Sequence, residues 1–218
     1  MLSVVIPTLN AAATLGPCLA AAAEADEIVV VDGGSTDGTG DIAQRHGARL
    51  VQSPRGRGIQ LAAGAAAARG DWLLFLHADT RIAPGWRRAA DRHGALHPDK
   101  AACFRFRLEA GERRARLIEA GVALRVRALG LPYGDQGLLL SRRLYDEVGG
   151  YRPMPLMEDV DLVRRIGARR IERIGIDAVT SAERWRSGGW LTRSGRNLVC
   201  LALYRLGMSA ERVARLYG

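Results

Sequence analysis

Residues 27–39 read EIVVVDGGSTDGT, a short apolar run that ends at Asp32 and passes directly into a glycine-rich turn. Three similar runs occur before residue 80: LSVVI at 2–6, ARLVQS at 48–53 and DWLLFLHAD at 71–79. Alanine-rich segments typical of helices separate them. This alternation predicts an α/β fold with a mostly parallel central sheet flanked by helices on both faces.

The composition fits one folded domain. The 218 residues are enough for one α/β domain with a substantial core and too few for two. Hydrophobic residues make up 48% of the chain and charged residues 25%, which excludes a disordered protein. The net charge of +9 does not by itself choose between a nucleic acid, a membrane and a phosphorylated substrate. We therefore expect a single domain over residues 1–218.

Cysteine usage and the N-terminal sequence indicate a cytoplasmic protein. Cys18, Cys103 and Cys200 are widely spaced and form no Cys-x-x-Cys pair, as expected for reduced thiols. No basic residue precedes the first short apolar run, and no apolar stretch approaches the roughly 20 residues of a membrane-spanning helix.

Polar residues follow the ends of the apolar runs. The residues 7–10, PTLN, follow the first run, Asp32 ends the second, and His77 and Asp79 follow the fourth. Because ligands of such sheets bind outside the carboxyl ends of the strands, these residues should face one crevice. Asp32 could accept hydrogen bonds from a nucleobase or a ribose. A helix cap explains residues 35–38 equally well, but it does not require an acid at Asp32.

Two other nucleotide-binding patterns are poorly placed. GTGDIA at 38–43 matches a Gly-x-Gly-x-x-Ala fingerprint, and GRGIQL at 56–61 matches it in part. The dinucleotide fingerprint belongs in the turn directly after the first strand, and here that turn is PTLN. The sequence contains no Gly-x-x-x-x-Gly-Lys-Ser/Thr, which excludes a P-loop NTPase.

Two further segments suit a phosphorylated, metal-bound ligand. Arg55 and Arg57 alternate with glycines just before an alanine-rich segment, an arrangement that suits a diphosphate, although a solvated basic loop would look the same. Asp79 could hold Mg²⁺ or Mn²⁺, which prefer oxygen ligands. His77 stands where an acid-x-acid metal motif has its first acid, so Asp79 is the stronger candidate of the two.

The segment PLMEDVDLVRR at 155–165 brings Glu158, Asp159 and Asp161 to the expected start of a helix. The helix dipole favours acids at this position, but three acids exceed what capping needs. One of them could act as general base on a hydroxyl group if its surroundings raise its pKa. Farther along, Arg184 could bind phosphate and Trp185 could stack on a sugar. An amphipathic surface patch would explain this Arg-Trp pair equally well.

The pattern changes after residue 100. We predict strands at 103–110 and 138–141, helices at 112–129, 158–168 and 190–207, and a turn LPYGDQG at 131–137.

The segments VVIPTLN, VVDGGSTDGT, FLHADT, GDQG and EDVDL, in this order, resemble glycosyltransferase family 2 over residues 2–185. The resemblance implies a GT-A fold, with a Rossmann-like sheet, and an inverting transferase. Its donor would be a nucleotide-diphosphate sugar, a UDP-sugar by default, and its cofactor Mn²⁺ or Mg²⁺. Residues 1–100 would bind the donor, residues 101–185 the acceptor, and residues 186–218 would form a helical tail.

The resemblance also implies residue roles. Asp159 would be the base, with Glu158 beside it, and Asp79, with His77, would be at the metal. The predicted substrate-binding residues are Thr8, Asn10 and Asp32 at the nucleoside, Arg55 and Arg57 at the ribose or diphosphate, Gly134, Asp135 and Gln136 on the acceptor side, and Arg184 and Trp185. Ser181 stands where the family's Gln-x-x-Arg-Trp motif has Gln, which argues against a processive polysaccharide synthase.

FLHADT followed by Pro84-Gly85-Trp86 is similar to a small soluble subgroup of the family. That subgroup is associated with radical-SAM partners and, by implication, with arsenosugar biosynthesis. The acceptor would be an unidentified small molecule or a lipid-linked compound.

Two other functions compete with sugar transfer. A sugar-phosphate nucleotidyltransferase would carry a glycine-rich loop with a lysine in the first turn, and PTLN has neither. A basic nucleic-acid-binding protein would leave Asp32, Asp79 and Asp159 unexplained, so no nucleic acid is expected as a partner.

Two helices could contact other surfaces. The predicted helix at 190–207 combines apolar residues with arginines, so it could pack on the core or touch the inner face of an anionic membrane. The helix at 112–129 has enough apolar surface to form a homodimer.

Overall fold

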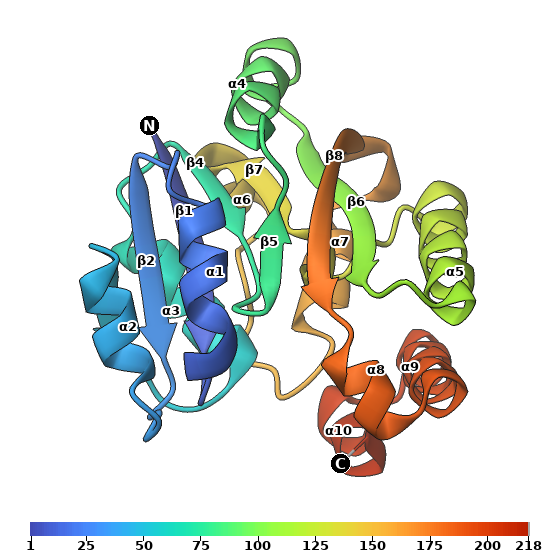
Figure 1. Ribbon diagram of the computed structural model, residues 1–218. Coiled ribbons are helices and arrows are strands. Elements are labelled where there is room, and N and C mark those ends of the chain that lie inside the picture. Colours follow the sequence, from blue (N-terminus) through green and yellow to red (C-terminus); the bar gives the residue numbers. More distant parts are fainter. Residues whose placement is uncertain (218) are drawn as a thin grey trace.

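The computed structural model describes residues 1–217, without the side chains of Arg184, Ser187, Leu191, Arg193 and Tyr217 (Figure 1). In this part of the chain one sheet of eight strands runs in the order β3-β2-β1-β4-β7-β6-β8-β5. The strands are β1 (Leu2–Thr8), β2 (Glu27–Asp32), β3 (Arg49–Gln52), β4 (Trp72–Phe75), β5 (Thr80–Ile82), β6 (Ala101–Glu109), β7 (Leu138–Ser141) and β8 (Ile171–Ser181).

The helices lie between and after these strands. They are α1 (Ala12–Ala21), α2 (Thr39–Arg45), α3 (Arg57–Ala67), α4 (Trp86–Leu96), α5 (Arg113–Leu129), α6 (Arg142–Glu147), α7 (Glu158–Ile166), α8 (Glu183–Gly188), α9 (Trp190–Arg205) and α10 (Ala210–Tyr217), with short 3₁₀ turns η1 (Gly134–Gln136) and η2 (Ala168–Arg170). Within residues 1–217, no helix combines the length and the apolar character needed to cross a bilayer.

The sheet has a parallel half and a mixed half. Strands β1, β2, β3 and β4 are mutually parallel where they pair. Strand β7 runs antiparallel to both β4 and β6, and β5 runs antiparallel to β8 at the far edge. Strands β6 and β8 are parallel, with a shift in register between Cys103 and Arg105. The sheet therefore contains strands from both halves of the sequence.

Helices cover both faces of the sheet (Figure 1). Side chains of α1, α2 and α4 pack on one face, with Ile6, Val30 and Leu74. Side chains of α3, α6 and α7 pack on the other face, with Val5, Val31 and Leu73. The side chains of neighbouring residues in a strand thus point to opposite faces of the sheet, as the geometry of a β-strand requires. This arrangement confirms the predicted α/β fold.

The C-terminal helices form two smaller clusters. Phe106 of β6, Ala115 of α5 and Trp185 of α8 pack together in one. In the other, Met157, which precedes α7, packs with Cys200 of α9 and Val213 of α10. The end of the chain is thereby joined to the start of α7.

Candidate active site

The ends of β1 and β2 hold a fixed carboxylate. Thr8 pairs with Asp32 in the sheet register, and its Oγ1 donates a hydrogen bond of 3.1 Å to Asp32 Oδ1. The backbone N–H groups of Ser35 and Gly34 donate to Asp32 Oδ2 over 2.9 and 3.2 Å. Burial opposes ionisation of Asp32, but these bonds and the one from the Ser35 hydroxyl bring its pKa below the usual value. Asp32 is therefore a preorganised anion.

Asn10 and Gln60 fix the loops around this carboxylate. Asn10 has a left-handed backbone, with φ of 50°, and its Oδ1 accepts a 2.9 Å bond from the N–H of Thr36. Gln60 is buried in α3 and donates from Nε2 to the carbonyl oxygens of Thr8, over 2.7 Å, and of Val31, over 2.9 Å. The sequence analysis missed Gln60, although a glutamine among alanines in a packed helix was a signal for such a role.

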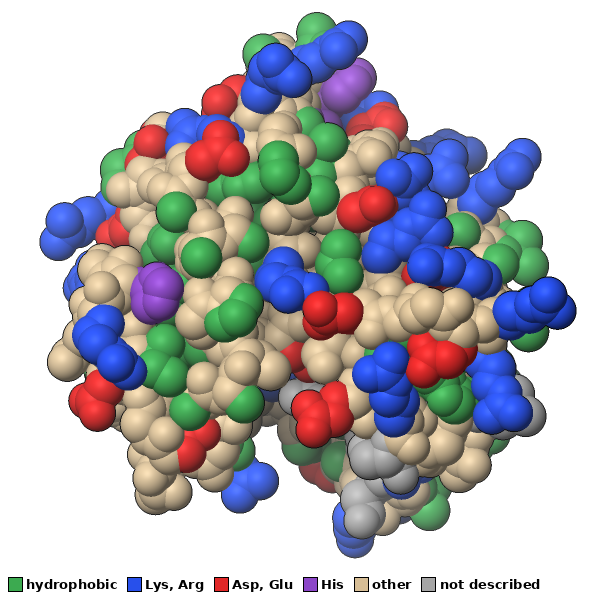
Figure 2. All heavy atoms as spheres, viewed as in Figure 1, with side chains coloured by type: hydrophobic (Ala, Val, Ile, Leu, Met, Phe, Trp, Pro, Cys, Tyr) green, Lys and Arg blue, Asp and Glu red, His purple; other side chains and the backbone are tan. Residues whose placement is uncertain are grey.

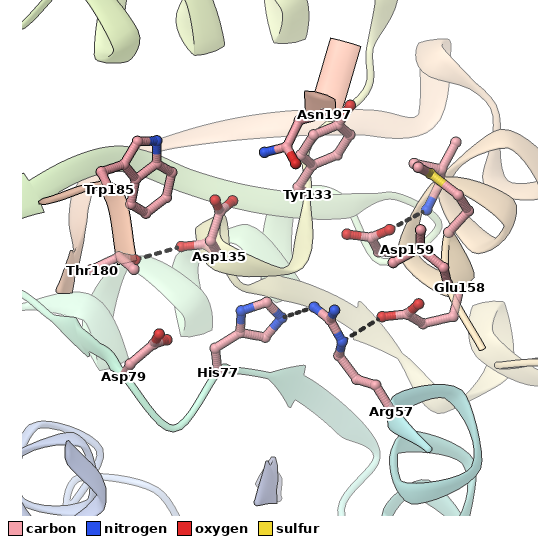
Figure 3. Close-up of a pocket in the computed structure, with 13 residues that line it drawn as sticks. Arg57, His77, Asp79, Tyr133, Asp135, Glu158, Asp159, Thr180, Trp185 and Asn197 are labelled. Atoms are coloured by element: carbon pink, nitrogen blue, oxygen red, sulfur yellow. Dashed lines mark hydrogen bonds and ion pairs between the residues drawn. The ribbon is translucent and has the colours of Figure 1, made fainter. Parts of the chain in front are cut away.

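Thr8, Asn10 and Gln60 line a groove of about 540 Å³ at the carboxyl ends of the strands, which we call the strand-end groove, while Asp32 lies behind this wall and is only 3% exposed. The walls of the groove also include Arg55 and Glu183. A smaller cavity of about 120 Å³ adjoins it, which we call the inner pocket (Figure 3). Arg57, His77 and Asp79 line both, so a ligand in the groove could reach the inner pocket past these three side chains.

Arg57 is held by a buried acid. Its Nε lies 2.8 Å from Glu158 Oε1, and the Glu158 side chain is only 2% exposed. Burial raises the pKa of Glu158, and the charge of Arg57 opposes that rise. The guanidinium Nη1 also lies 3.3 Å from His77 Nε2 (Figure 3). Glu158 and His77 thus fix the direction of Arg57 toward the cavities.

Close packing of α3 on the sheet brings Arg57 to this place. A Cβ at Gly64 of α3 would collide with the side chains of Val5 and Val31, so only glycine lets the helix approach β1 and β2 this closely. The first residue of α3 is Arg57. The helix therefore delivers its N-terminal side chain to the edge where the strands end.

Asp159 lies at the start of α7 and faces the inner pocket. Its Oδ2 accepts a 2.9 Å bond from the N–H of Gly134, and its Oδ1 accepts a 2.7 Å bond from the N–H of Val160. The preceding residue, Met157, has a left-handed backbone with φ of 66°, a conformation that costs energy for a residue with a side chain. The turn that carries Asp159 is therefore held by its surroundings in one orientation.

Asp135 is a half-buried carboxylate of the inner pocket whose Oδ1 is shielded from solvent. Among residues 1–217, nothing donates a hydrogen bond to its Oδ1. Burial raises the pKa of Asp135 to about 6; the charge of Arg125 opposes the rise, and the charges of Asp159 and Asp79 add to it. A cation bound nearby would reverse this balance.

His77 packs directly against Gly134 of η1. A Cβ at Gly134 would collide with the His77 ring. We expect Gly134→Ala to lower the free energy of unfolding by about 1–3 kcal/mol, because the ring or the turn must move. Chemical denaturation would measure this change.

Gly111→Ala is the matched control, since a Cβ at Gly111 would meet no atom within 4 Å. Equal stabilities for the two variants would contradict the close contact between His77 and Gly134.

Some of the other predicted residues line a cavity and some do not. Arg55 lies on the strand-end groove, and Trp185 lines the inner pocket. Gln136 does not line either cavity; its Nε2 donates to the carbonyl oxygen of Phe104 over 3.2 Å. The side chain of Arg184 lies outside the described residues. Residues of the inner pocket that the sequence analysis missed are Tyr133, Leu156, Met157, Val160, Thr180 and Asn197.

The site fits a metal that shares its ligands with a substrate. Within the described residues, no three His, Cys, Asp or Glu side chains are grouped closely enough to hold a metal ion. Asp79 and Asp135 nevertheless line the same pocket, and Asp135 has an oxygen without a donor in the part of the chain described. Mg²⁺ is commonly held by one or two carboxylates together with substrate phosphates, which is what this pair could offer.

Comparison with known proteins agrees with this geometry. The family model described as Glycosyl transferase family 2 matches residues 3–151, more than half of the chain. A PGL/p-HBAD biosynthesis glycosyltransferase of Mycobacterium bovis is 44% identical over 99 residues, which cover 38% of this chain and 36% of the relative. An uncharacterized glycosyltransferase of the same species is 39% identical over 84 residues, covering 38% of each chain. The match thus spans little more than a third of these relatives.

Solved structures share the fold. Glucosyl-3-phosphoglycerate synthase from Mycobacterium tuberculosis, in complex with phosphoglyceric acid, superposes with a TM-score of 0.67 at 23% identity, covering 95% of this chain and 80% of that one. The same enzyme with Mn²⁺, UDP and glucosyl-3-phosphoglycerate gives a TM-score of 0.65 at 24% identity, with the same coverage. S. aureus TarS 1–349 gives 0.64 at 18% identity, covering 84% of this chain and 61% of that one.

Proposed function

The chain belongs to glycosyltransferase family 2 and has the GT-A fold, and from this premise we propose that it transfers a sugar, with inversion, from a nucleotide-diphosphate donor to an acceptor hydroxyl. One observation carries the proposal. The strand-end groove and the inner pocket share Arg57, His77 and Asp79, so a donor in the groove would present its sugar to Asp159 in the pocket.

The strand-end groove is the proposed donor site. The fixed anion Asp32, with Thr8 and Asn10, would bind the nucleoside, and Arg55 and Arg57 the ribose or the diphosphate. We propose uridine as the base, because the structurally similar glucosyl-3-phosphoglycerate synthase is seen with UDP. Residues 1–100 would then form most of the donor site.

Asp79 and Asp135 are the proposed protein ligands of Mn²⁺ or Mg²⁺, with His77 beside them. Support comes from the orphaned oxygen of Asp135 and from the Mn²⁺ and Mg²⁺ seen with UDP in glucosyl-3-phosphoglycerate synthase. When bound, the ion would neutralise charge on the leaving diphosphate. Asp135 was expected on the acceptor side, and the proposal moves it to the metal.

Asp159 is the proposed general base. In a single displacement the acceptor oxygen bonds to the anomeric carbon, the bond from that carbon to the diphosphate breaks, and the bonding pair leaves with the diphosphate. The proton of the acceptor hydroxyl passes to Asp159, which the N–H groups of Gly134 and Val160 hold in place. Arg57 faces the diphosphate, and Glu158 positions Arg57 rather than touching the substrate.

The acceptor half, residues 101–185, supplies Tyr133, Asp135 and Thr180 to the inner pocket, and the tail, residues 186–218, supplies Asn197. The lining is mixed, because Leu156, Met157 and Trp185 add apolar surface. No feature of the pocket favours an arsenosugar over another acceptor, so that assignment stays a prediction.

The proposed function is tested by thermal unfolding with UDP, GDP, CDP, ADP and NAD, each with and without Mn²⁺. We expect UDP with Mn²⁺ to stabilise the protein by about 2.7 kcal/mol at a hundred times the dissociation constant. That corresponds to a rise in Tm of roughly 5–10 °C for a domain of this size.

The variant Asp79→Asn is the control, and it should lose the part of the shift that depends on Mn²⁺. A shift with NAD alone would overturn the proposal. UTP and a sugar phosphate, added to the same series, test the nucleotidyltransferase alternative: a shift with these two and with no diphosphate would favour it.

A further inference from the structure

Helix α9 leaves one face apolar and uncovered. Cys200 and Leu201 point inward, and they pack with Met157 and Val160 of the α7 region. On the outer side, Leu198 is 61% exposed, and Val199 and Leu206 are also more than half exposed. Residues 198, 202 and 206 follow the spacing of four that places side chains on one side of a helix. Ala202 is exposed between the two leucines.

Helix α5 presents a second stripe of the same kind. Leu117 and Leu124 are more than half exposed, while Ala115 and Val126 are buried on the opposite side. The start of α9 lies near α5, because Trp190 packs on the hydrophobic cluster that contains Ala115 of α5. Figure 1 shows α5 and α9 on the same side of the molecule, opposite α2.

The helices that carry the stripes, together with α10, are rich in arginine. Helices α5, α9 and α10 together contain ten arginines and two glutamates, and one of these acids, Glu119, is buried between Arg107 and Arg116. Figure 2 shows basic side chains gathered on the side where α5 lies. Exposed apolar side chains flanked by arginines match the layered chemistry of an anionic lipid surface, with acyl chains below and phosphate groups above.

A second copy of this chain is a poorer occupant. It would bring its own arginine-flanked helices against these, and like charges at close range repel. The net charge of +9 adds to that repulsion at longer range.

We infer that α5 and α9 seat this protein on an anionic membrane surface. Leu198 and Val199 enter the acyl boundary, and arginines such as Arg205 and Arg113 contact lipid phosphates. Asn197, which lines the inner pocket, directly precedes Leu198 in the chain, so the same helix carries both a wall of the pocket and the proposed seat. The seat is separate from the donor site, and its test does not depend on sugar transfer.

The experiment is flotation of the whole chain with two kinds of vesicle, phosphatidylcholine alone and phosphatidylcholine mixed with phosphatidylglycerol, at low and high salt. We expect binding to the mixed vesicles at low salt, weaker binding at high salt, and none to the neutral vesicles. The double variant Leu198→Gln, Val199→Gln should bind about tenfold more weakly.

Leu96→Gln is the matched control, since Leu96 is 60% exposed on α4, outside the proposed seat, and this variant should bind like the unchanged protein. Thermal unfolding without ligand, measured on the same variants, checks that the double variant remains folded and keeps this test separate from that of the proposed function. Failure of the unchanged chain to float with anionic vesicles overturns the inference, as does equal binding of the double variant. Concentration-dependent dimerisation that the double variant abolishes, without vesicle binding, would assign the stripes to a second copy and also overturn it.

Discussion

Replacement of Asp159 by Asn is expected to lower kcat for sugar transfer by about 10²–10⁴-fold, the usual contribution of a general base. The asparagine oxygen can still accept a hydrogen bond from the N–H of Gly134, so the turn at the start of α7 keeps its orientation. The amide cannot take up the acceptor proton. Steady-state kinetics would measure the loss, and the UDP shift with Mn²⁺ should stay unchanged because the donor site is intact.

Asp161→Asn provides the comparison. Asp161 lies two residues farther along α7, pairs with Arg165 over 2.6 Å and does not line the inner pocket. Its replacement should affect stability more than kcat. If Asp159→Asn retained kcat within a factor of about ten, the proton would have to go elsewhere and the assignment of the base would fail.

Replacement of Asp135 by Asn is expected to stabilise the metal-free protein at pH 7, by on the order of 2–3 kcal/mol, and to abolish the stabilisation by UDP that depends on Mn²⁺. The first effect follows from removing a buried charge that no described residue hydrogen-bonds at Oδ1. The second follows because an amide is a poor substitute for a carboxylate at a cation. Thermal unfolding with and without Mn²⁺ and UDP measures both effects.

The same variant makes a prediction about pH. The pKa of Asp135 rises from 3.8 to about 6 on folding, so between these values the folded protein binds more protons than the unfolded chain. The free energy of unfolding therefore falls as the pH rises through this window. The cost of ionising Asp135 in the folded protein is absent only below about pH 4, where the carboxyl is protonated in both the folded and the unfolded state. Asp135→Asn should remove this part of the decline. If the variant were destabilised at pH 7 without metal, the ionised Asp135 carboxylate would be stabilising in the folded protein, and this prediction would be wrong.

Local sequence predicted the parallel half of the fold well. The apolar runs at 2–6, 27–32, 48–53 and 71–79 correspond to strands β1 to β4, and the helices predicted around 112–129, 158–168 and 190–207 are α5, α7 and α9. Strands β5 and β8 were missed. The β8 sequence, IERIGIDAVTS, mixes charges with apolar residues, and β5 has three residues, so only pairing with distant partners identifies them as strands.

The site residues also divide into those that local sequence predicts and those that depend on distant parts of the chain. Of the residues predicted after strands, Thr8, His77 and Asp79 line the cavities, because parallel strands end at one edge. Asp32 lines neither cavity and is hydrogen-bonded to Thr8 behind the groove wall. The sequence could not show that Glu158 faces Arg57, since these residues are a hundred positions apart. The catalytic roles of the site residues are predictions, which the variants described above test.

The order in which the site can assemble follows from the pairing of β5 with β8. Asp79 immediately precedes β5, its carbonyl oxygen accepts a 3.1 Å bond from the N–H of Ser181, and Thr80 bonds Thr180 at a separation of 100 residues. During synthesis, the first four strands can pair while most of the chain is still unmade. The loop that carries Asp79 must wait until residue 181 has left the ribosome, and the strand-end groove, whose walls include Ser181 and Glu183, is complete no earlier than that loop.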